Sequence, residues 1–402
     1  MRHYIVDIPW CRQLLACDHQ NMIGRLIDKS TYYRIRMSLD GQVDQRIELP
    51  KSTLFASTPQ DVTGSQSVVS EVHWLFAKDR IIGMRLNGDV ESEIELADLP
   101  LSLPANEKYE IGEMLATTEA LYLSINHSSS NIKHQPVRHD LTATVAKLSL
   151  NGDLIWSAKF PTELIFSSLI FSSQSTEVNP QKKLKVKKMS PWLPTSWRPF
   201  GHDCLVLSGD RLLAKFAESS SGISRHYLLD ASSGERLSRT DWSAGGFISQ
   251  ANLNEFLVGA QGYGQFHTDL LTADGSCADH WDSHGYSFLH EAKYFSIQMA
   301  NTCSQPQRCV EMVPGGKIAF VSDPLGGYYT TRPQRLADGH LYFWRNNRVW
   351  KWDLDGGVEP IIETDFGDSA FGHSTQLSDQ RVAFSIRTRK KPGESKLLIV
   401  DI

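Results

Sequence analysis

Histidines that follow a Phe-Gly pair are the first candidates for chemistry in this chain of 402 residues. The tripeptide Phe-Gly-His occurs twice, ending at His202 and at His373, and His284 lies between them in the sequence. Imidazole nitrogens bind divalent metals, and a neutral imidazole acts as a general base near neutral pH. We therefore consider a catalytic site built from His202, His284 and His373, with a divalent metal as an option.

Two further polar residues accompany these histidines. Asp203 directly follows His202, and His290 ends the run that begins at Asp282, so both are candidate ligand-binding residues. The alternative is structural: Phe-Gly-His is a motif at the entry to a blade, and its histidine ties adjacent loops by hydrogen bonds. No two of the three candidates His202, His284 and His373 have an H-x-x-x-H or comparable ligand spacing, which favours the structural alternative, and no cofactor is predicted.

A second candidate binding segment is Asp323-Pro-Leu-Gly-Gly-Tyr-Tyr-Thr-Thr-Arg. The rings of Tyr328 and Tyr329 offer faces for stacking, and the guanidinium of Arg332 can pair with an anion. Glycine-flanked aromatic residues are also ordinary turn material, so the segment supports a ligand site and a plain connection alike.

The most concentrated positive charge lies in the run Lys182–Lys188, followed by a stretch rich in Pro and Trp. Such a run could dock an acidic partner, RNA or an anionic surface. Lysines that alternate with Leu184 and Val186 equally describe a solvated edge strand protected against aggregation, which is the interpretation that we favour.

The overall composition excludes several classes. A formal charge of -5 and a pI near 6.3 make a general nucleic-acid surface unlikely, since neutralising phosphates requires a basic excess. The chain contains no apolar stretch of the length that spans a bilayer, and its first residues do not resemble a signal peptide. With 6 cysteines, too few for a disulfide scaffold, these features predict a cytoplasmic protein without a membrane span.

The elements that must position these residues are short strands joined by Asp-Gly and Asn-Gly turns. Both dipeptides tolerate positive φ, so we expect tight hairpins with type I′ turns. Turn glycines recur about every 40 residues in the second half of the chain, at Gly234, Gly275, Gly316 and Gly356. That period is typical of a four-stranded propeller blade, as in WD40-like repeats. Earlier turns, at Gly41, Gly88 and Gly152, are spaced more widely.

The sequence therefore predicts an all-β fold: a single closed β-propeller of about eight four-stranded blades over residues 1–402. The strand at His3–Ile8 has no blade of its own, and we expect it to complete the last blade beside Lys396–Ile402. Seven blades are the alternative if the final strands form an incomplete blade. The basic, Pro- and Trp-rich segment at about 171–199 is expected to be an insertion.

Two repeats resemble those of quinoprotein-like propellers with PQQ-type repeats, in which Leu-Asp-x-x-x-Gly precedes a strand carrying Trp. These repeats are Leu229-Asp-Ala-Ser-Ser-Gly and Leu150-Asn-Gly-Asp-Leu-Ile-Trp. The resemblance implies the fold. In that family the enzymes are typically exported and hold a quinone and calcium, which the first residues and the loss of Trp from most repeats of this chain argue against.

Two functions follow from this sequence. The first is a binding or scaffolding propeller that presents one face or its channel to a protein or peptide partner. The alternative is a lyase or hydrolase with a histidine site at the channel mouth, acting on a small-molecule substrate with or without a divalent metal.

Overall fold

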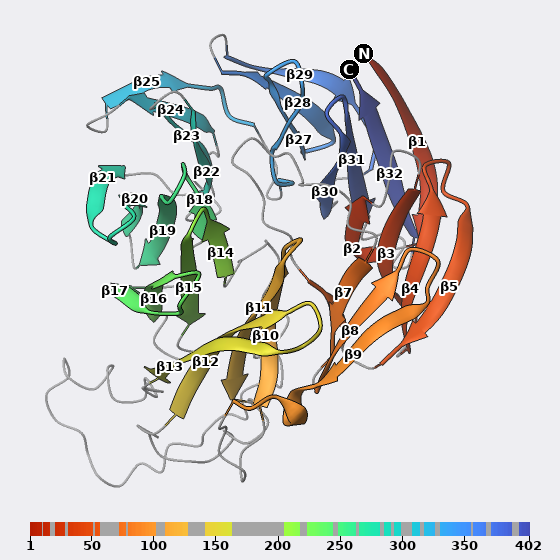
Figure 1. Ribbon diagram of the computed structural model, residues 1–402. Helices are drawn as coiled ribbons and strands as arrows, with labels where there is room; N and C mark the ends of the chain where they lie inside the picture. Colours follow the sequence, from red (N-terminus) through yellow and green to blue (C-terminus); the bar gives the residue numbers. More distant parts are fainter. Residues whose placement is uncertain are drawn as a thin grey trace, which may run out of the picture.

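The computed structural model describes residues 1–9, 11–16, 21–28, 31–50, 53–56, 72–77, 79–101, 109–127, 141–162, 205–217, 223–243, 248–262, 265–281, 285–290, 293–298, 308–313, 317–325, 330–354, 357–366, 371–387 and 394–402. In these residues the chain forms eight four-stranded antiparallel sheets and a short 3-10 helix, Leu96–Asp98. The sheets follow one another around a ring (Figure 1). Each sheet is one blade of a β-propeller, so the prediction of eight blades is confirmed and seven is wrong.

Each blade runs from an inner strand at the centre of the ring to an outer strand at its rim. In that order, blade 1 is β2 (Cys11–Ala16), β3 (Asn21–Asp28), β4 (Thr31–Ser38) and β5 (Val43–Leu49); blade 2 is β6 (Leu54–Phe55), β7 (Val72–Phe76), β8 (Arg80–Arg85) and β9 (Val90–Glu95). Blade 3 is β10 (Tyr109–Ala116), β11 (Ala120–His127), β12 (Leu141–Ser149) and β13 (Leu154–Thr162); blade 4 is β14 (Leu205–Ser208), β15 (Arg211–Ala217), β16 (Ile223–Asp230) and β17 (Arg236–Ser243). Blade 5 is β18 (Ile248–Gln250), β19 (Phe256–Gly262), β20 (Gln265–Leu271) and β21 (Cys277–Trp281); blade 6 is β22 (Gly285–His290), β23 (Lys293–Gln298), β24 (Cys309–Val313) and β25 (Lys317–Val321). Blade 7 is β26 (Gln334–Arg335), β27 (Leu341–Arg345), β28 (Arg348–Asp353) and β29 (Gly357–Glu363); blade 8 is β30 (Phe371–Ser378), β31 (Arg381–Arg387), β32 (Glu394–Asp401) and β1 (Arg2–Pro9).

The ring closes in blade 8, where the first strand of the chain pairs with the last. Strand β1 runs antiparallel to β32, from the pair Arg2↔Asp401 to the pair Pro9↔Glu394. An ion pair between Lys396 and Asp7 lies across the same two strands. The predicted joint between His3–Ile8 and Lys396–Ile402 is thereby confirmed, and both chain ends lie side by side (Figure 1).

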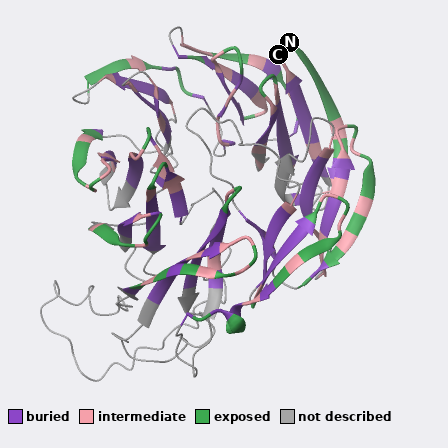
Figure 2. Cartoon of the chain, viewed as in Figure 1, coloured by how far each residue is buried: buried purple, intermediate pink, exposed green. Residues whose placement is uncertain are grey.

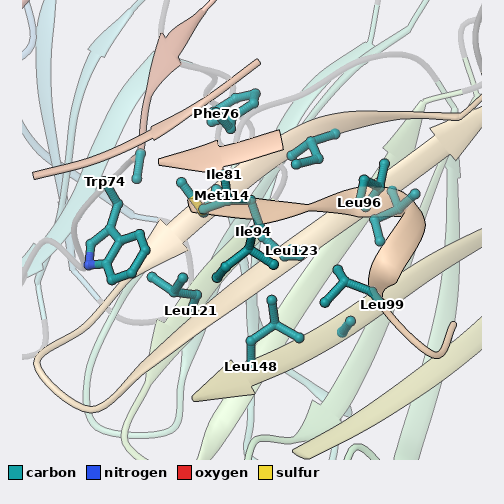
Figure 3. Packing of buried hydrophobic residues seen from close by; sticks show 14 of the residues in the cluster. Trp74, Phe76, Ile81, Ile94, Leu96, Leu99, Met114, Leu121, Leu123 and Leu148 are labelled. Carbon is teal, nitrogen blue, oxygen red and sulfur yellow. The ribbon is translucent and has the colours of Figure 1, made fainter. Parts of the chain in front are cut away.

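The hydrophobic core is distributed between neighbouring blades. Figure 3 shows one such cluster, in which Trp74 and Phe76 of blade 2 pack against Met114, Leu121 and Leu148 of blade 3. Burial is greatest on the second and third strands of the blades and falls toward the rim, where the outer strands are largely exposed (Figure 2). Because the second strands bury both faces against neighbouring blades, several of them are almost continuously apolar, such as Leu341–Arg345 in β27.

The turns before the outer strands differ from the predicted type I′ geometry. At Gly152, φ is +91°, whereas Asn151 is not among the non-glycine residues with positive φ. The Gly152 N–H donates to the Ser149 carbonyl (3.0 Å), and the Ser149 N–H donates to the Asp153 carbonyl (2.8 Å). This pattern is a three-residue loop, a type I turn closed by a left-handed glycine and followed by a bulge. The type I′ expectation is therefore wrong for this turn.

The same hydrogen bonds recur at three other turns, those of Gly41, Gly88 and Gly275. A type I′ turn does occur between β27 and β28, where Asn346 and Asn347 have φ values of 50° and 58°. The two-residue loop there leaves both central positions in the left-handed region, which asparagine tolerates better than most residues.

Side chains of one blade bind the carbonyls of the outer turn in the next blade. Lys147 Nζ and Trp156 Nε1 of blade 3 both donate to the Ala231 carbonyl of blade 4, at 3.1 and 3.2 Å. Arg34 Nη2 of blade 1 donates to two carbonyls of blade 2, those of Arg85 and Leu86, each at 3.1 Å. These bonds fasten neighbouring blades together and satisfy backbone groups that the turns leave unpaired.

Candidate binding groove on the turn face

Antiparallel order within each blade sorts the turns between two faces of the ring. The turns from first to second strand and from third to fourth strand lie on one face, which we call the turn face. The chain ends lie on this face as well, because the Ile402 N–H donates to the carbonyl of Gln380 in the first turn of blade 8 (2.9 Å).

Most of the predicted site residues lie outside the described residues: His202, Asp203, His284, Tyr328 and Tyr329. The backbone of His373 is described and belongs to the inner strand β30, opposite Ser385. His290 and Arg332 are described in full. The proposed convergence of His202, His284 and His373 therefore stays a prediction.

His290 is the last residue of the inner strand β22, at its turn-face end. Its Nδ1 lies 3.4 Å from Nη1 of Arg335, on the inner strand of blade 7. At about 3.3 Å per residue, the six-residue strand Gly285–His290 spans roughly 17 Å between its end residues. His290 thus belongs to the turn-face end of the channel and not to the end at which β22 begins.

The second Phe-Gly-His segment has a structural explanation at two positions. A Cβ added at Gly372 would lie 2.4 Å from the Ser385 carbonyl oxygen of β31, so close approach of the two backbones requires glycine. Beside His373, Ser374 Oγ donates to the Arg332 carbonyl (2.6 Å) and accepts from Gln334 Nε2 (3.1 Å). These bonds of Ser374 tie blades 7 and 8 together, and the role of the His373 side chain stays a prediction.

The described part of the chain contains no set of ligands for the divalent metal that the sequence suggested. No group of three or more His, Cys, Asp or Glu residues there is arranged to hold a metal ion.

A titratable cluster that the sequence analysis missed lies in blade 5, where Asp269 is buried and its Oδ1 lies 2.5 Å from His280 Nδ1. His267 Nε2 lies 3.9 Å from the other carboxylate oxygen. Only the pairing of β20 with β21, which the sequence does not reveal, brings the two histidines to one carboxylate.

A cavity of about 640 Å³ opens on the turn face between blades 7 and 8. The cavity, which we call the closure groove, is lined by Met1, Ala337, Asp338, Tyr342, Lys351, Glu359, Ile361, Gln380 and Ile402. Its inner end is fixed where the Ala337 N–H donates to the Asp379 carbonyl (2.6 Å), which joins the first turns of the two blades.

Asp338 is the best-defined charge in the closure groove. Tyr342 OH donates to Asp338 Oδ2 (2.6 Å), and the His340 backbone N–H donates to Oδ1 (3.1 Å). Burial raises the pKa of Asp338, but the hydrogen bonds from Tyr342 and His340 outweigh this effect and leave the pKa below its usual value. The pKa of Tyr342 is raised, first by burial and then by the same carboxylate. Near neutral pH the pair is therefore a carboxylate held by a neutral phenol.

The remaining charges of the groove come from the outer half of blade 7. Lys351 and Glu359 are a cross-strand pair of β28 and β29, and Ile361 follows on β29. The groove thus offers two carboxylates, one ammonium group and apolar surface from Ile361 and Ala337. This mixture suits a ligand that carries a positive charge beside an apolar group.

Acidic residues also recur on the turns of the rest of this face. They are Glu119, Asp210, Glu255, Asp338 and Asp379 in the first turns and Asp40, Asp89, Asp153, Asp230 and Asp274 in the last turns. Hydrogen bonds from Ser232 and Ser233 lower the pKa of Asp230 to about 2, and bonds from Thr272 and Ser276 lower that of Asp274 to about 2. Asp230 and Asp274 therefore stay ionised throughout the physiological pH range.

Comparisons with known proteins find similarity in shape and none in sequence. No protein family and no curated protein matches its sequence. Among solved structures, hydrazine synthase from Kuenenia stuttgartiensis has a TM-score of 0.46 at 10% identity, covering 96% of this chain and 94% of that chain.

Two further solved structures have similar values. A catalytically inactive virginiamycin B lyase from Staphylococcus aureus has a TM-score of 0.42 at 11% identity over 100% of both chains. The Pan2 WD40 domain of Neurospora crassa has a TM-score of 0.42 at 8% identity, covering 87% of this chain and 89% of that chain. At such distances no ligand or activity is transferred from these proteins, and the resemblance to quinoprotein repeats stays one of fold.

A search of the described residues finds no helix that could cross a membrane.

Proposed function

We propose that the protein is a binding or scaffolding propeller whose closure groove holds an extended, basic peptide segment of a protein partner. The observation that carries this proposal is the groove itself, a cavity of about 640 Å³ whose lining includes Asp338 and Glu359. Cavities of roughly 300–1,000 Å³ are the usual size for ligand sites in proteins.

The chemistry of the groove favours a basic segment over an acidic one. Asp338 stays ionised, so it and Glu359 would pair with a lysine or arginine of the partner, while Ile361 receives a neighbouring apolar side chain. The acidic turns around the groove would attract such a segment from a distance and raise the rate of association.

The groove also has the rigidity that a peptide site needs. On one side its wall is formed by strands β27, β28 and β29 of blade 7, on the other side by Gln380 in the first turn of blade 8 and the end residues Met1 and Ile402, and its inner end is held by the bond between Ala337 and Asp379. A preformed site loses little conformational entropy when it binds, so affinity depends mainly on the contacts with the peptide.

Site-specific photo-crosslinking tests the proposal in extracts of the source cell. A photoreactive amino acid at Ile361 is expected to crosslink a protein through a lysine- or arginine-containing segment. The matched control is Ile155, a 51% exposed isoleucine on the outer strand of blade 3. Equal crosslinking at both positions, or a crosslinked segment without basic residues, would contradict the proposal.

A synthetic peptide of the crosslinked segment then allows titration calorimetry. The variant Glu359→Lys is expected to weaken its binding at least about tenfold, because one attractive contact becomes a repulsive one. Added salt should weaken binding to the unmodified protein as well. Binding that survives Glu359→Lys unchanged would remove the groove from the interaction.

A further inference from the structure

Strand β25, on the rim of blade 6, differs in composition from the other outer strands. After Lys317 it consists of Ile, Ala, Phe and Val. Each of the other seven outer strands carries a charged residue or a proline inside the strand, such as Asp44 in β5, Glu93 in β9 and Pro360 in β29. Charges and prolines on edge strands prevent pairing with another chain, and β25 lacks both beyond its first residue.

The apolar residues of β25 are exposed on one face. Ile318 is 55% exposed and Val321 is 41% exposed. Ile318 pairs with Met312 and Val321 pairs with Val310, and both partners belong to the apolar cluster between blades 5 and 6. A β-bulge lies between these two pairs, so Ile318 and Val321, although three residues apart, lie opposite Met312 and Val310 on the same face.

The opposite face of β25 is covered by the molecule itself. Phe320 lies beside the last turn of blade 7, where a Cβ added at Gly357 would be 3.6 Å from its ring. Within the part of the chain that the structure describes, β24 is the one strand that pairs with β25. Among the described strands none covers the outer edge of β25, and Ile318 and Val321 are exposed beside it.

Charges of opposite sign flank this apolar strand. Lys317 begins it, Asp323 lies two residues beyond its end, and both are exposed. Neither forms an ion pair with another described residue. An antiparallel second copy of the strand would bring each Lys317 to the end at which its partner carries Asp323, whereas a parallel copy would place like charges together.

We propose that β25 is the contact of a two-fold symmetric dimer, in which the β25 strands of two copies pair antiparallel. In this arrangement Ile318 and Val321 of one copy meet Val321 and Ile318 of the other, so the apolar surface is self-complementary. A contact limited to one short strand from each copy buries less than a standard interface, and we expect a dissociation constant of roughly 10–100 μM.

Sedimentation velocity over about 1–200 μM protein tests this contact. The average mass should rise with concentration from the 45.2 kDa of one chain toward twice that value. Val321→Lys should raise the dissociation constant at least about tenfold, because the dimer would force two lysines among apolar side chains. Val43→Lys is the matched control, since Val43 is 42% exposed on the outer strand of blade 1. Thermal unfolding of both variants shows that the fold is kept.

Charge reversal separates this pairing from other modes of association. Lys317→Asp and Asp323→Lys should each weaken the dimer, and the double variant should restore it to within about twofold of the original, because the ends again carry opposite charges. The proposal is overturned if the unmodified protein stays monomeric up to about 200 μM, if Val43→Lys is as disruptive as Val321→Lys, or if the double variant is weaker than both single variants. These results do not depend on the closure groove.

Discussion

Gly234 shows how one residue of the repeated turn joins two blades. Its φ is +74°, and a Cβ at this position would lie 2.5 Å from Trp156 Cε3 on the outer strand of blade 3. Trp156 is buried and its Nε1 is already bonded to the Ala231 carbonyl, so the ring cannot easily move away. The turn glycine therefore provides both a left-handed backbone and contact between blades.

Replacing this glycine separates the two contributions. We expect Gly234→Ala to lower the free energy of unfolding by about 2–4 kcal/mol, from backbone strain plus overpacking against Trp156. Gly339 is the matched control, because its φ is +84° and an added Cβ would meet nothing within 4 Å. Gly339→Ala should cost only about 1 kcal/mol. Urea unfolding measures both values, and equal losses would show that packing against Trp156 does not matter.

His73 makes stability depend on pH. Burial first, and the nearby charge of Arg34 second, lower the pKa of His73 from 6.5 to about 4. Between these values the unfolded chain binds a proton that the folded protein does not, so stability is full above pH 6.5 and falls as the pH drops toward 4. This difference amounts to about 2 kcal/mol between pH 7.5 and pH 5.

The variant His73→Gln provides the comparison, because glutamine does not titrate. Its urea midpoint should change less between pH 7.5 and pH 5 than that of the unmodified protein, by the equivalent of about 2 kcal/mol. An identical pH dependence in both proteins would assign the loss to other groups.

At the scale of elements, charged side chains that reach into the next turn fasten the blades. Arg34 is fully buried and donates to the carbonyls of Arg85 and Leu86 in blade 2. We expect Arg34→Met to lower the free energy of unfolding by about 3 kcal/mol, since buried carbonyls lose their donors. Arg46→Met is the control: Arg46 pairs with Asp28 (3.1 Å) while largely exposed and should cost at most about 1 kcal/mol in thermal or urea unfolding.

The strands and their order were predictable from the sequence, whereas the geometry of the turns was only partly so. Asn-Gly and Asp-Gly located the turns at Gly41, Gly88, Gly152 and Gly275, where glycine supplies positive φ, whereas Gly316 and Gly356 lie outside the described residues. The same dipeptides suit both type I′ turns and type I turns with a bulge, and the choice depends on how the turn packs on the preceding blade. At Gly152 that neighbour is Ile94, which no local pattern reveals.

The candidate site was less predictable for a similar reason. From the sequence, the candidate residues were expected just before the inner strands. His290 instead lies at the turn-face end of the inner strand β22, beside Arg335. The closure groove combines residues of blade 7 with both ends of the chain, from Met1 to Ile402. Such a combination becomes visible only after the ring has closed, because its members are spread over the full length of the sequence.

At the scale of the whole molecule, β1 holds the ring closed. It pairs with β32 along its whole length, and Ile8 packs in the apolar cluster with Leu397 and Ile399. Deleting residues 1–9 should lower the melting temperature by about 10 °C or more and promote aggregation through the exposed edge of β32. Differential scanning calorimetry with size-exclusion chromatography measures both effects, and an unchanged melting temperature would show that closure contributes little.

The period of about 40 residues explains why the architecture as a whole could be predicted. Each repeat is one sheet that cannot bury both faces alone, so repeats of this length must stack, and antiparallel sheets stack into a ring. The strand at His3–Ile8 had no blade of its own, and the last blade lacked a fourth strand, so these two features together identified the joint. The described residues confirm this inference at β1 and β32.

The joint between β1 and β32 also determines when the ring can close during synthesis. Strand β1 leaves the ribosome long before β32, and at about 5–20 residues per second the interval between them is roughly 20–80 s. Blades 1 to 7 each contain strands that are contiguous in the sequence and can form as they emerge. Blade 8 cannot form in this way. Until β32 has been synthesised, β1 stays unpaired and its edge is exposed. Chaperones that bind nascent chains therefore have the longest time to act at this strand.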